Sequence, residues 1–329
     1  MPSVMVGPVL LMWVHHLDPV ALPLFGGLVI RWYGLAYLLG FLCGFLLLRQ
    51  LARRGLWVLK PGQTGDFMAA AALFGVFLGG RIGYVLFYQL PEIGWGGLLR
   101  DPLMVLRVWE GGMASHGGIA GLLVFTWVYA RRHRVTWTGL GDGLCVVAPV
   151  GLLFGRLANF INGELYGRVA GDKVPWAVVF PESLREESQD VQRAVWEACS
   201  AAEPQATAAA ESIGSLVAAA RDHPELSRVF GSFLPPRHPS QLYEAFTEGA
   251  LLLAILWWVR TRFPKAPDGL CTGLFFALYA LFRIVCEQFR EPDAPLVGGI
   301  TKGQFFSLFM FLFAAGFLLH AWRGRPVRA

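Results

Sequence analysis

Seven long apolar segments constrain the fold of this chain more than any other feature. Each has about the length at which a helix crosses a ~30 Å hydrocarbon core. Hydrophobic residues make up 55% of the 329 residues and charged residues 16%, which is typical of a polytopic membrane protein. We therefore predict an all-α fold of about seven transmembrane helices, over residues 29–48, 67–89, 115–130, 140–158, 241–260, 268–287 and 304–322.

Lysine and arginine residues predict the orientation of this bundle. Short cytoplasmic loops carry an excess of positive charge. Thirteen basic residues fall in four stretches that are thereby assigned to the cytoplasmic side: 49–66, 131–139, 260–265 and 323–328. The N-terminus is then predicted outside and the C-terminus inside. This asymmetry also accounts for the net charge of +5, so no nucleic-acid partner is expected.

One large hydrophilic region interrupts the apolar pattern. The prediction divides the chain into transmembrane helices 1–4 (residues 1–158), a small extracytoplasmic head (159–240) and transmembrane helices 5–7 (241–329). The middle of the head, about residues 184–228, predicts two or three short helices with a turn near Glu203 and Pro204. We interpret it as a variable surface insert, because surface loops tolerate insertion.

Cysteine spacing indicates neither a disulfide framework nor a metal site. Four of the five cysteines lie in apolar segments and Cys199 lies in the head, so they form neither a disulfide framework nor a cluster with metal-ligand spacing. We expect a protein without a metal site.

Ionisable residues gather at the outer ends of the predicted spans. His116 starts the third span, Arg156 ends the fourth and Arg283 lies near the end of the sixth. A charge at the centre of a bilayer costs about 2.5–3.5 kcal/mol on insertion scales, so such residues are functional candidates. The sequence places a single carboxylate near three arginines, Arg156, Arg283 and Arg290, which leaves a surplus of positive charge. We predict one outward-facing polar pocket that binds a phosphate.

Spacing supports this grouping. Arg156 and Asn159 are i, i+3 neighbours, and four residues of the sixth span follow i, i+4, i+8 and i+11 on one helix face: Tyr279, Arg283, Glu287 and Arg290. The Arg283–Glu287 pair is equally consistent with a structural role. Gly75, Gly79 and Gly83 recur every four residues, a pattern that predicts close helix packing. Arg81, on the same segment, is open between a structural and a lipid-contacting role.

These residues together resemble the prolipoprotein diacylglyceryl transferase family. The matching stretches run through most of the chain, and the fifth of them is the family's signature: Arg31–Gly34, Gly75–Tyr84, Trp109–Met113, His116–Gly118, Gly155–Glu164, Arg237–Glu244 and Phe282–Arg290. The insert at about 181–233 departs from the family, because it is longer than the usual linker.

The resemblance implies a multi-pass enzyme of the bacterial cytoplasmic (inner) membrane that acts, without a cofactor, in the first step of lipoprotein maturation. The thiol of a prolipoprotein's lipobox cysteine would attack phosphatidylglycerol, form a thioether-linked diacylglycerol and release glycerol 1-phosphate. Its partners would be phosphatidylglycerol, lipobox-bearing signal peptides and the lipid bilayer, and we expect a monomer.

The resemblance also implies roles for single residues. His116, Arg156 and Arg283 would be catalytic, and six others would bind substrate: Tyr33, Asn159, Glu164, Gly167, Glu287 and Arg290. A free cysteine has a pKa of about 8.5, so the thiol needs activation near pH 7. Two alternatives stay open: His116 takes the proton, or the arginines depress the thiol pKa and His116 positions the substrate.

Two rival functions are consistent with some of the same residues. Arginines in a helical bundle also describe a transporter or channel for an organic phosphate, but apart from Asp142 the ionisable residues stop in the outer half. An intramembrane hydrolase that uses His116 and the adjacent Ser115 is the other alternative, and no Gly-x-Ser-x-Gly motif supports it.

Overall fold

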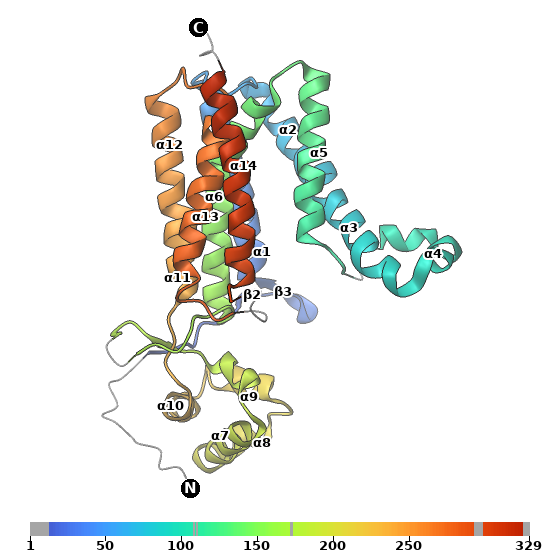
Figure 1. The fold of residues 1–329 in the computed structure, drawn as a ribbon. Coiled ribbons are helices and arrows are strands. Elements are labelled where there is room, and N and C mark those ends of the chain that lie inside the picture. Colours follow the sequence, from blue (N-terminus) through green and yellow to red (C-terminus); the bar gives the residue numbers. More distant parts are fainter. Residues whose placement is uncertain (1–12, 108, 110, 172–173, 293–298, 325–329) are drawn as a thin grey trace. The chain divides into compact units, whose positions relative to one another are not determined.

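The computed structural model describes residues 13–107, 109, 111–171, 174–292 and 299–324 (Figure 1). Positions 325–328 of the basic C-terminal stretch lie outside the described residues. The described chain is mostly helical, as predicted, and divides into two compact units. Unit 1 contains Met1–Phe41, Pro149–Leu253 and Ala277–Leu312, and unit 2 contains Leu42–Ala148, Ala254–Phe276 and Phe313–Ala329.

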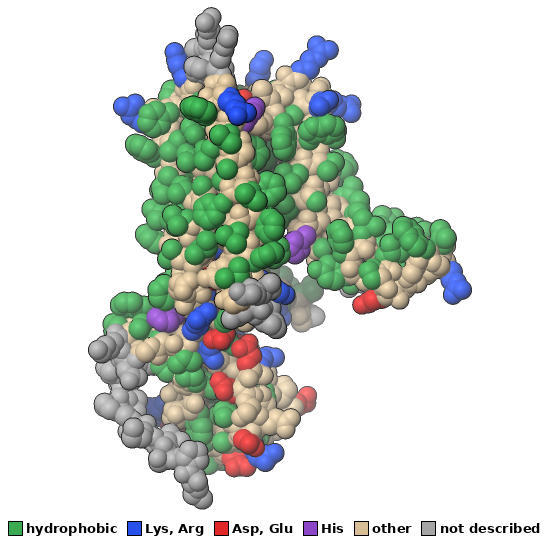
Figure 2. All heavy atoms as spheres, viewed as in Figure 1, with side chains coloured by type: hydrophobic (Ala, Val, Ile, Leu, Met, Phe, Trp, Pro, Cys, Tyr) green, Lys and Arg blue, Asp and Glu red, His purple; other side chains and the backbone are tan. Residues whose placement is uncertain are grey.

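Five helices in the described part of the chain are long and apolar enough to cross a membrane. They are Trp32–Arg53 (α1), Pro61–Arg100, Trp137–Asn162 (α6), Ser240–Arg262 and Lys302–Arg323 (α14). Large apolar side chains such as Leu312 and Phe313 are 69% and 60% exposed on α14, and hydrophobic side chains cover the long helices in Figure 2. Exposure of such large apolar surfaces to water is unfavourable, whereas their contact with lipid chains is not.

The other two predicted spans are not among these five. The segment predicted at 268–287 forms the apolar helix α13, Leu270–Cys286, which has 17 residues. The segment predicted at 115–130 forms α5, Ser115–His133, which has 19 residues. A count of seven spans therefore stays a prediction.

Two of the long helices are composite. Pro61–Arg100 consists of a 3₁₀ turn Pro61–Gln63, helices α2 (Thr64–Ala70), α3 (Leu78–Tyr84) and α4 (Leu90–Arg100), and π-helical segments Ala71–Phe77 and Val85–Gln89. Ser240–Arg262 consists of α11 (Ser240–Glu244), a π-helical segment Ala245–Leu251 and α12 (Leu252–Arg262). Such π segments often mark functional sites.

The small-residue pattern in unit 2 packs two helices together, as predicted. A Cβ atom on Gly79 would lie 2.6 Å from the carbonyl oxygen of Gly117 and 2.7 Å from the Cα of Gly121. Gly83 approaches Gly117 in the same way. The backbones of α3 and α5 therefore touch without intervening side chains, which is what recurring glycines permit.

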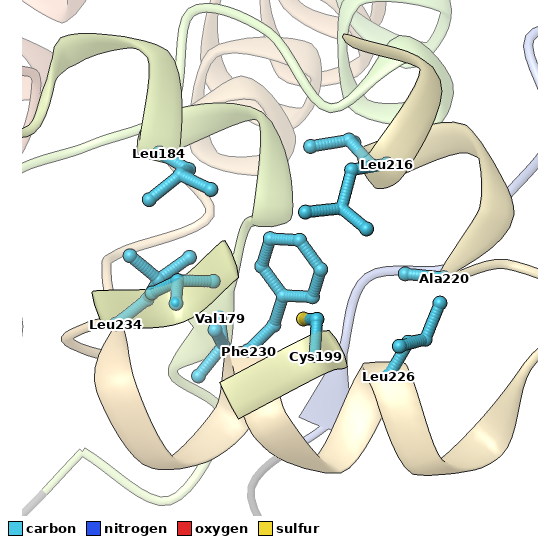
Figure 3. Close-up of a cluster of buried hydrophobic side chains, with 10 residues drawn as sticks. Val179, Leu184, Cys199, Leu216, Ala220, Leu226, Phe230 and Leu234 are labelled. Atoms are coloured by element: carbon cyan, nitrogen blue, oxygen red, sulfur yellow. The ribbon is translucent and has the colours of Figure 1, made fainter. Parts of the chain in front are cut away.

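The head folds around its own apolar core in unit 1. Four helices form it, more than the two or three predicted: α7 (Gln189–Ala202), α8 (Pro204–Ala208), α9 (Ile213–Ala219) and α10 (Pro224–Phe233). The predicted turn at Glu203 separates α7 from α8. Phe230, Leu226 and Cys199 are fully buried in this core, and the Phe230 ring lies in the middle of the cluster in Figure 3, so the insert is a small packed module.

One of two short strand pairs links the beginning of the described chain to the head. Strand β1 (Trp13–Val14) pairs in parallel with β4 (Val178–Val179), and β2 (Val20–Pro23) pairs antiparallel with β3 (Val29–Arg31). His15 follows β1, is 6% exposed, and donates from Nε2 to the Phe160 carbonyl oxygen at 2.7 Å. Burial lowers the pKa of His15 to about 4.

We expect acid to destabilise this junction through His15. The folded-state pKa lies below the unfolded value of about 6.5, so stability contributed by neutral His15 is complete above pH 6.5 and is lost as the pH falls toward 4. The loss is about 3 kcal/mol between neutral pH and pH 4. Unfolding of the wild type and of His15→Gln, which does not titrate, measures it. Equal pH dependence in both proteins would contradict the assignment.

Candidate active site

A cluster of buried ion pairs in unit 1 is built around Glu244, the last residue of α11. Its carboxylate is fully buried and contacts three guanidiniums. Arg283 Nη1 lies 2.6 Å from Oε1, Arg290 Nη1 lies 3.1 Å from Oε1, and Arg156 Nη1 lies 3.2 Å from Oε2. Arginines from two distant segments of the chain, around residue 156 and at residues 283–290, thus share one carboxylate. The predicted grouping of Arg156, Arg283 and Arg290 is confirmed.

Two further glutamates complete the cluster. Glu248, one helical turn after Glu244, is fully buried and lies 3.4 Å from Arg156 Nη2 and 3.7 Å from Arg283 Nη1. Glu287 Oε2 lies 3.4 Å from Arg283 Nη2, as the sequence spacing suggested. Glu244 and Glu248 were not predicted as site residues, although two carboxylates four residues apart in an apolar run are a usable signal.

The predicted surplus of positive charge is wrong for this set of described residues. Three carboxylates face three guanidiniums, so formal charges balance. Two of the arginines are more accessible than two of the glutamates, however: the side chains of Arg156 and Arg283 are 16% and 13% exposed, whereas those of Glu244 and Glu248 are 0% exposed. Glu244 and Glu248 therefore contact these guanidiniums from the buried side, and the guanidiniums of Arg156 and Arg283 keep an exposed edge. A guanidinium has five N–H donors, so carboxylate contacts leave donors for a ligand.

The backbone that carries Arg290 is not helical, in contrast to the prediction. Helix α13 ends at Cys286, so Arg290 is not on its face but in an isolated bridge to Gly167. A Cβ atom on Gly167 would collide with the carbonyl oxygens of Phe289 and His238. Glycine is needed there because three backbone segments cross, and this crossing fixes the backbone that carries Arg290. Direct binding of substrate by Gly167 stays a prediction.

Tyr33, Asn159 and Glu164 form a second polar cluster in unit 1. The Tyr33 hydroxyl, from the start of α1, donates to Glu164 Oε1, and Asn159 Nδ2, from α6, donates to Tyr33 and to Glu164 Oε1, the latter at 2.9 Å. Asn159 lies one turn after Arg156 on α6. The signature stretch thus contributes to both clusters.

His116 lies in unit 2, in the first turn of α5, with its side chain exposed. The two glycines that follow it, Gly117 and Gly118, are buried, and Gly117 packs against Gly79 and Gly83. A common location of His116 with the arginines stays a prediction.

Two other ionisable residues of the long apolar helices have structural roles. Arg81 is 4% exposed and donates to four backbone carbonyls, those of Val105 (2.9 Å), Gly111 (2.7 Å), Gly112 (3.1 Å) and Met104 (2.5 Å). Arg81 anchors the loop before α5, and these contacts favour the structural role over the lipid-contacting role. Asp142 accepts from the backbone N–H groups of Gly269 and Thr272 and so caps α13.

Comparison with known proteins extends over almost the whole chain. The family model described as "Prolipoprotein diacylglyceryl transferase" matches residues 19–320. Among curated relatives, the phosphatidylglycerol–prolipoprotein diacylglyceryl transferase of Azospirillum brasilense is 41% identical over 94% of this chain and 96% of its own length. The proteins of that name from Psychrobacter arcticus and Erwinia tasmaniensis are 37% and 39% identical, over 95% and 94% of this chain and 96% and 94% of their own lengths.

Proposed function

Because the chain belongs to the prolipoprotein diacylglyceryl transferase family, we propose that it transfers the diacylglyceryl group of phosphatidylglycerol to the lipobox cysteine of prolipoproteins. The reaction forms a carbon–sulfur bond and breaks the bond between the glyceryl carbon and the phosphate oxygen. Glycerol 1-phosphate leaves, and the thiol proton goes to a base. The observation that carries the proposal is the match to the family over most of the chain, together with the buried arginine cluster.

The arginine cluster supports phosphate binding. Negative charge grows on the leaving phosphate as the carbon–oxygen bond breaks, and preorganised guanidiniums stabilise such charge most effectively in a site of low polarity. Arg156 and Arg283 combine access with support by Glu244 and Glu248, so we assign them to the leaving phosphate. Glu287 positions Arg283, and Arg290 binds a lipid headgroup.

The remaining predicted residues receive complementary roles. Tyr33, Asn159 and Glu164 orient the headgroup glycerol through the hydrogen-bond donors and acceptors that their cluster presents. We propose His116 as the base that takes the thiol proton, since a neutral imidazole is the side chain best matched to proton transfer near pH 7.

The topology extends this proposal. Adding α5 and α13 to the five long helices gives the seven spans that the apolar pattern predicts. With the N-terminus outside and the C-terminus in the cytoplasm, the head is extracytoplasmic. The monomer would then face secreted prolipoproteins at the outer surface of the bacterial cytoplasmic membrane.

An assay with purified protein in detergent tests the reaction. With phosphatidylglycerol and a lipobox peptide, we expect release of glycerol phosphate and a peptide mass increased by one diacylglyceryl group. A peptide in which serine replaces the cysteine serves as the control and should release nothing, because a hydroxyl is a far weaker nucleophile than a thiolate. Equal consumption of lipid with the serine peptide would identify a lipase.

A further inference from the structure

A cavity of about 380 Å³ lies within unit 1, where α6 ends and the head begins. Its size is in the range of small-ligand sites, about 300–1,000 Å³. The walls come from the β2–β3 region, the end of the signature stretch and the head: Pro19, Arg31, Asn162–Tyr166, Glu182, Arg185, Glu186 and Arg221. Neither Arg156 nor Arg283 lines it, so the cavity is distinct from the arginine cluster.

The cavity presents both kinds of hydrogen-bonding group. Glu182 already pairs with Arg185 at 2.6 Å and with Arg221 at 3.6 Å. Arg31 is exposed, and no ion pair among the described residues involves it. Asn162 Oδ1 is buried and accepts no hydrogen bond within the described structure. A buried acceptor without a donor favours a ligand that brings an N–H group.

The wall of the cavity is continuous with the candidate active site. Glu164 lines the cavity, and its carboxylate also accepts from Tyr33 and Asn159. Asn159 in turn lies one helical turn from Arg156 on α6. A ligand in the cavity would therefore sit beside groups that we assign to the reacting lipid.

We propose that this cavity binds the polypeptide segment that follows the lipobox cysteine of the prolipoprotein, an inference that rests on the proposed function. A peptide backbone offers N–H groups to Asn162 and to the glutamates, and carbonyl oxygens to Arg31. A phosphate offers acceptors alone, and the carboxylates of Glu164, Glu182 and Glu186 repel it. The segment after the cysteine is also the part of the substrate that leaves the membrane, where the head lies in the proposed topology.

Two peptides test the proposal. One extends several residues beyond the cysteine, and the other ends at the cysteine as an amide. With wild-type protein we expect the KM of the truncated peptide to be about tenfold higher. Arg31→Ala and Asn162→Ala should raise the KM of the long peptide toward that of the truncated one, with little change in kcat and no change for the truncated peptide. Arg228→Ala, an exposed head variant outside the cavity, is the control.

The outcomes separate the proposals. Equal use of both peptides by the wild type, or equal losses with both peptides in the variants, would overturn the peptide site while the transferase assignment stands. A higher KM for phosphatidylglycerol instead of the peptide would reassign the cavity to a lipid headgroup and overturn it as well. If neither peptide is lipidated, the proposed function itself fails.

Discussion

Arg156→Lys is expected to lower turnover by about 100-fold or more while the protein still inserts and folds. Arg156 uses its two terminal nitrogens on different carboxylates, Nη1 at 3.2 Å from Glu244 and Nη2 at 3.4 Å from Glu248. A lysine keeps the charge that balances the glutamates, so the fold persists. It is a point charge and cannot contact both carboxylates and a phosphate in the same fixed geometry. Loss of one preorganised donor to a developing oxyanion typically costs about 10²–10³ in kcat.

The lipobox peptide assay measures this effect, and Arg228→Lys is a matched control. Arg228 also pairs with a carboxylate, that of Glu225 at 2.5 Å, but its side chain is 74% exposed on the head. Exposed pairs contribute little, so we expect turnover within about twofold of wild type. Near-normal turnover of Arg156→Lys would remove the argument that a forked donor is needed.

The sequence predicts the helical scaffold well, because apolar runs of membrane-spanning length are local signals. Close packing of the segment around α3 against another helix also follows from local spacing, because Gly75, Gly79 and Gly83 share one face, but the identity of the partner helix α5 does not. The pairing of β1 with β4 does not follow from the sequence, because the two-residue strand at Trp13 pairs with a strand at Val178, far away in the chain. Strands so short carry no periodicity, and nothing local specifies a partner that distant.

The site could be predicted in part for the same reason. Arg156, Arg283 and Glu287 stand out as charges in apolar segments, and their grouping is confirmed. The charge balance was wrong because Glu244 and Glu248 were not counted as their partners, although a buried guanidinium requires a counter-charge. The end of α13 at Cys286 was also missed, since the spacing of Arg290 continues a helical pattern that the backbone does not follow.

Glu244→Gln is expected to destabilise the protein more than any other single change in the cluster. Glu244 is fully buried and is contacted by three guanidiniums at 2.6–3.2 Å. A glutamine has nearly the same shape but leaves three buried cations facing two carboxylates. Breaking a buried pair by removing one partner costs about 3–5 kcal/mol, because the remaining charge is uncompensated.

The order of effects distinguishes this electrostatic explanation from simple loss of packing. We expect thermal unfolding in detergent to show the largest loss for Glu244→Gln. Glu248→Gln should lose less, since Glu248 has two longer contacts, at 3.4 and 3.7 Å. Glu225→Gln, on the exposed face of the head, should change little. Because all three substitutions conserve volume, a packing effect predicts small and similar losses at the two buried sites, and that result would contradict the role of Glu244 as the shared counter-ion.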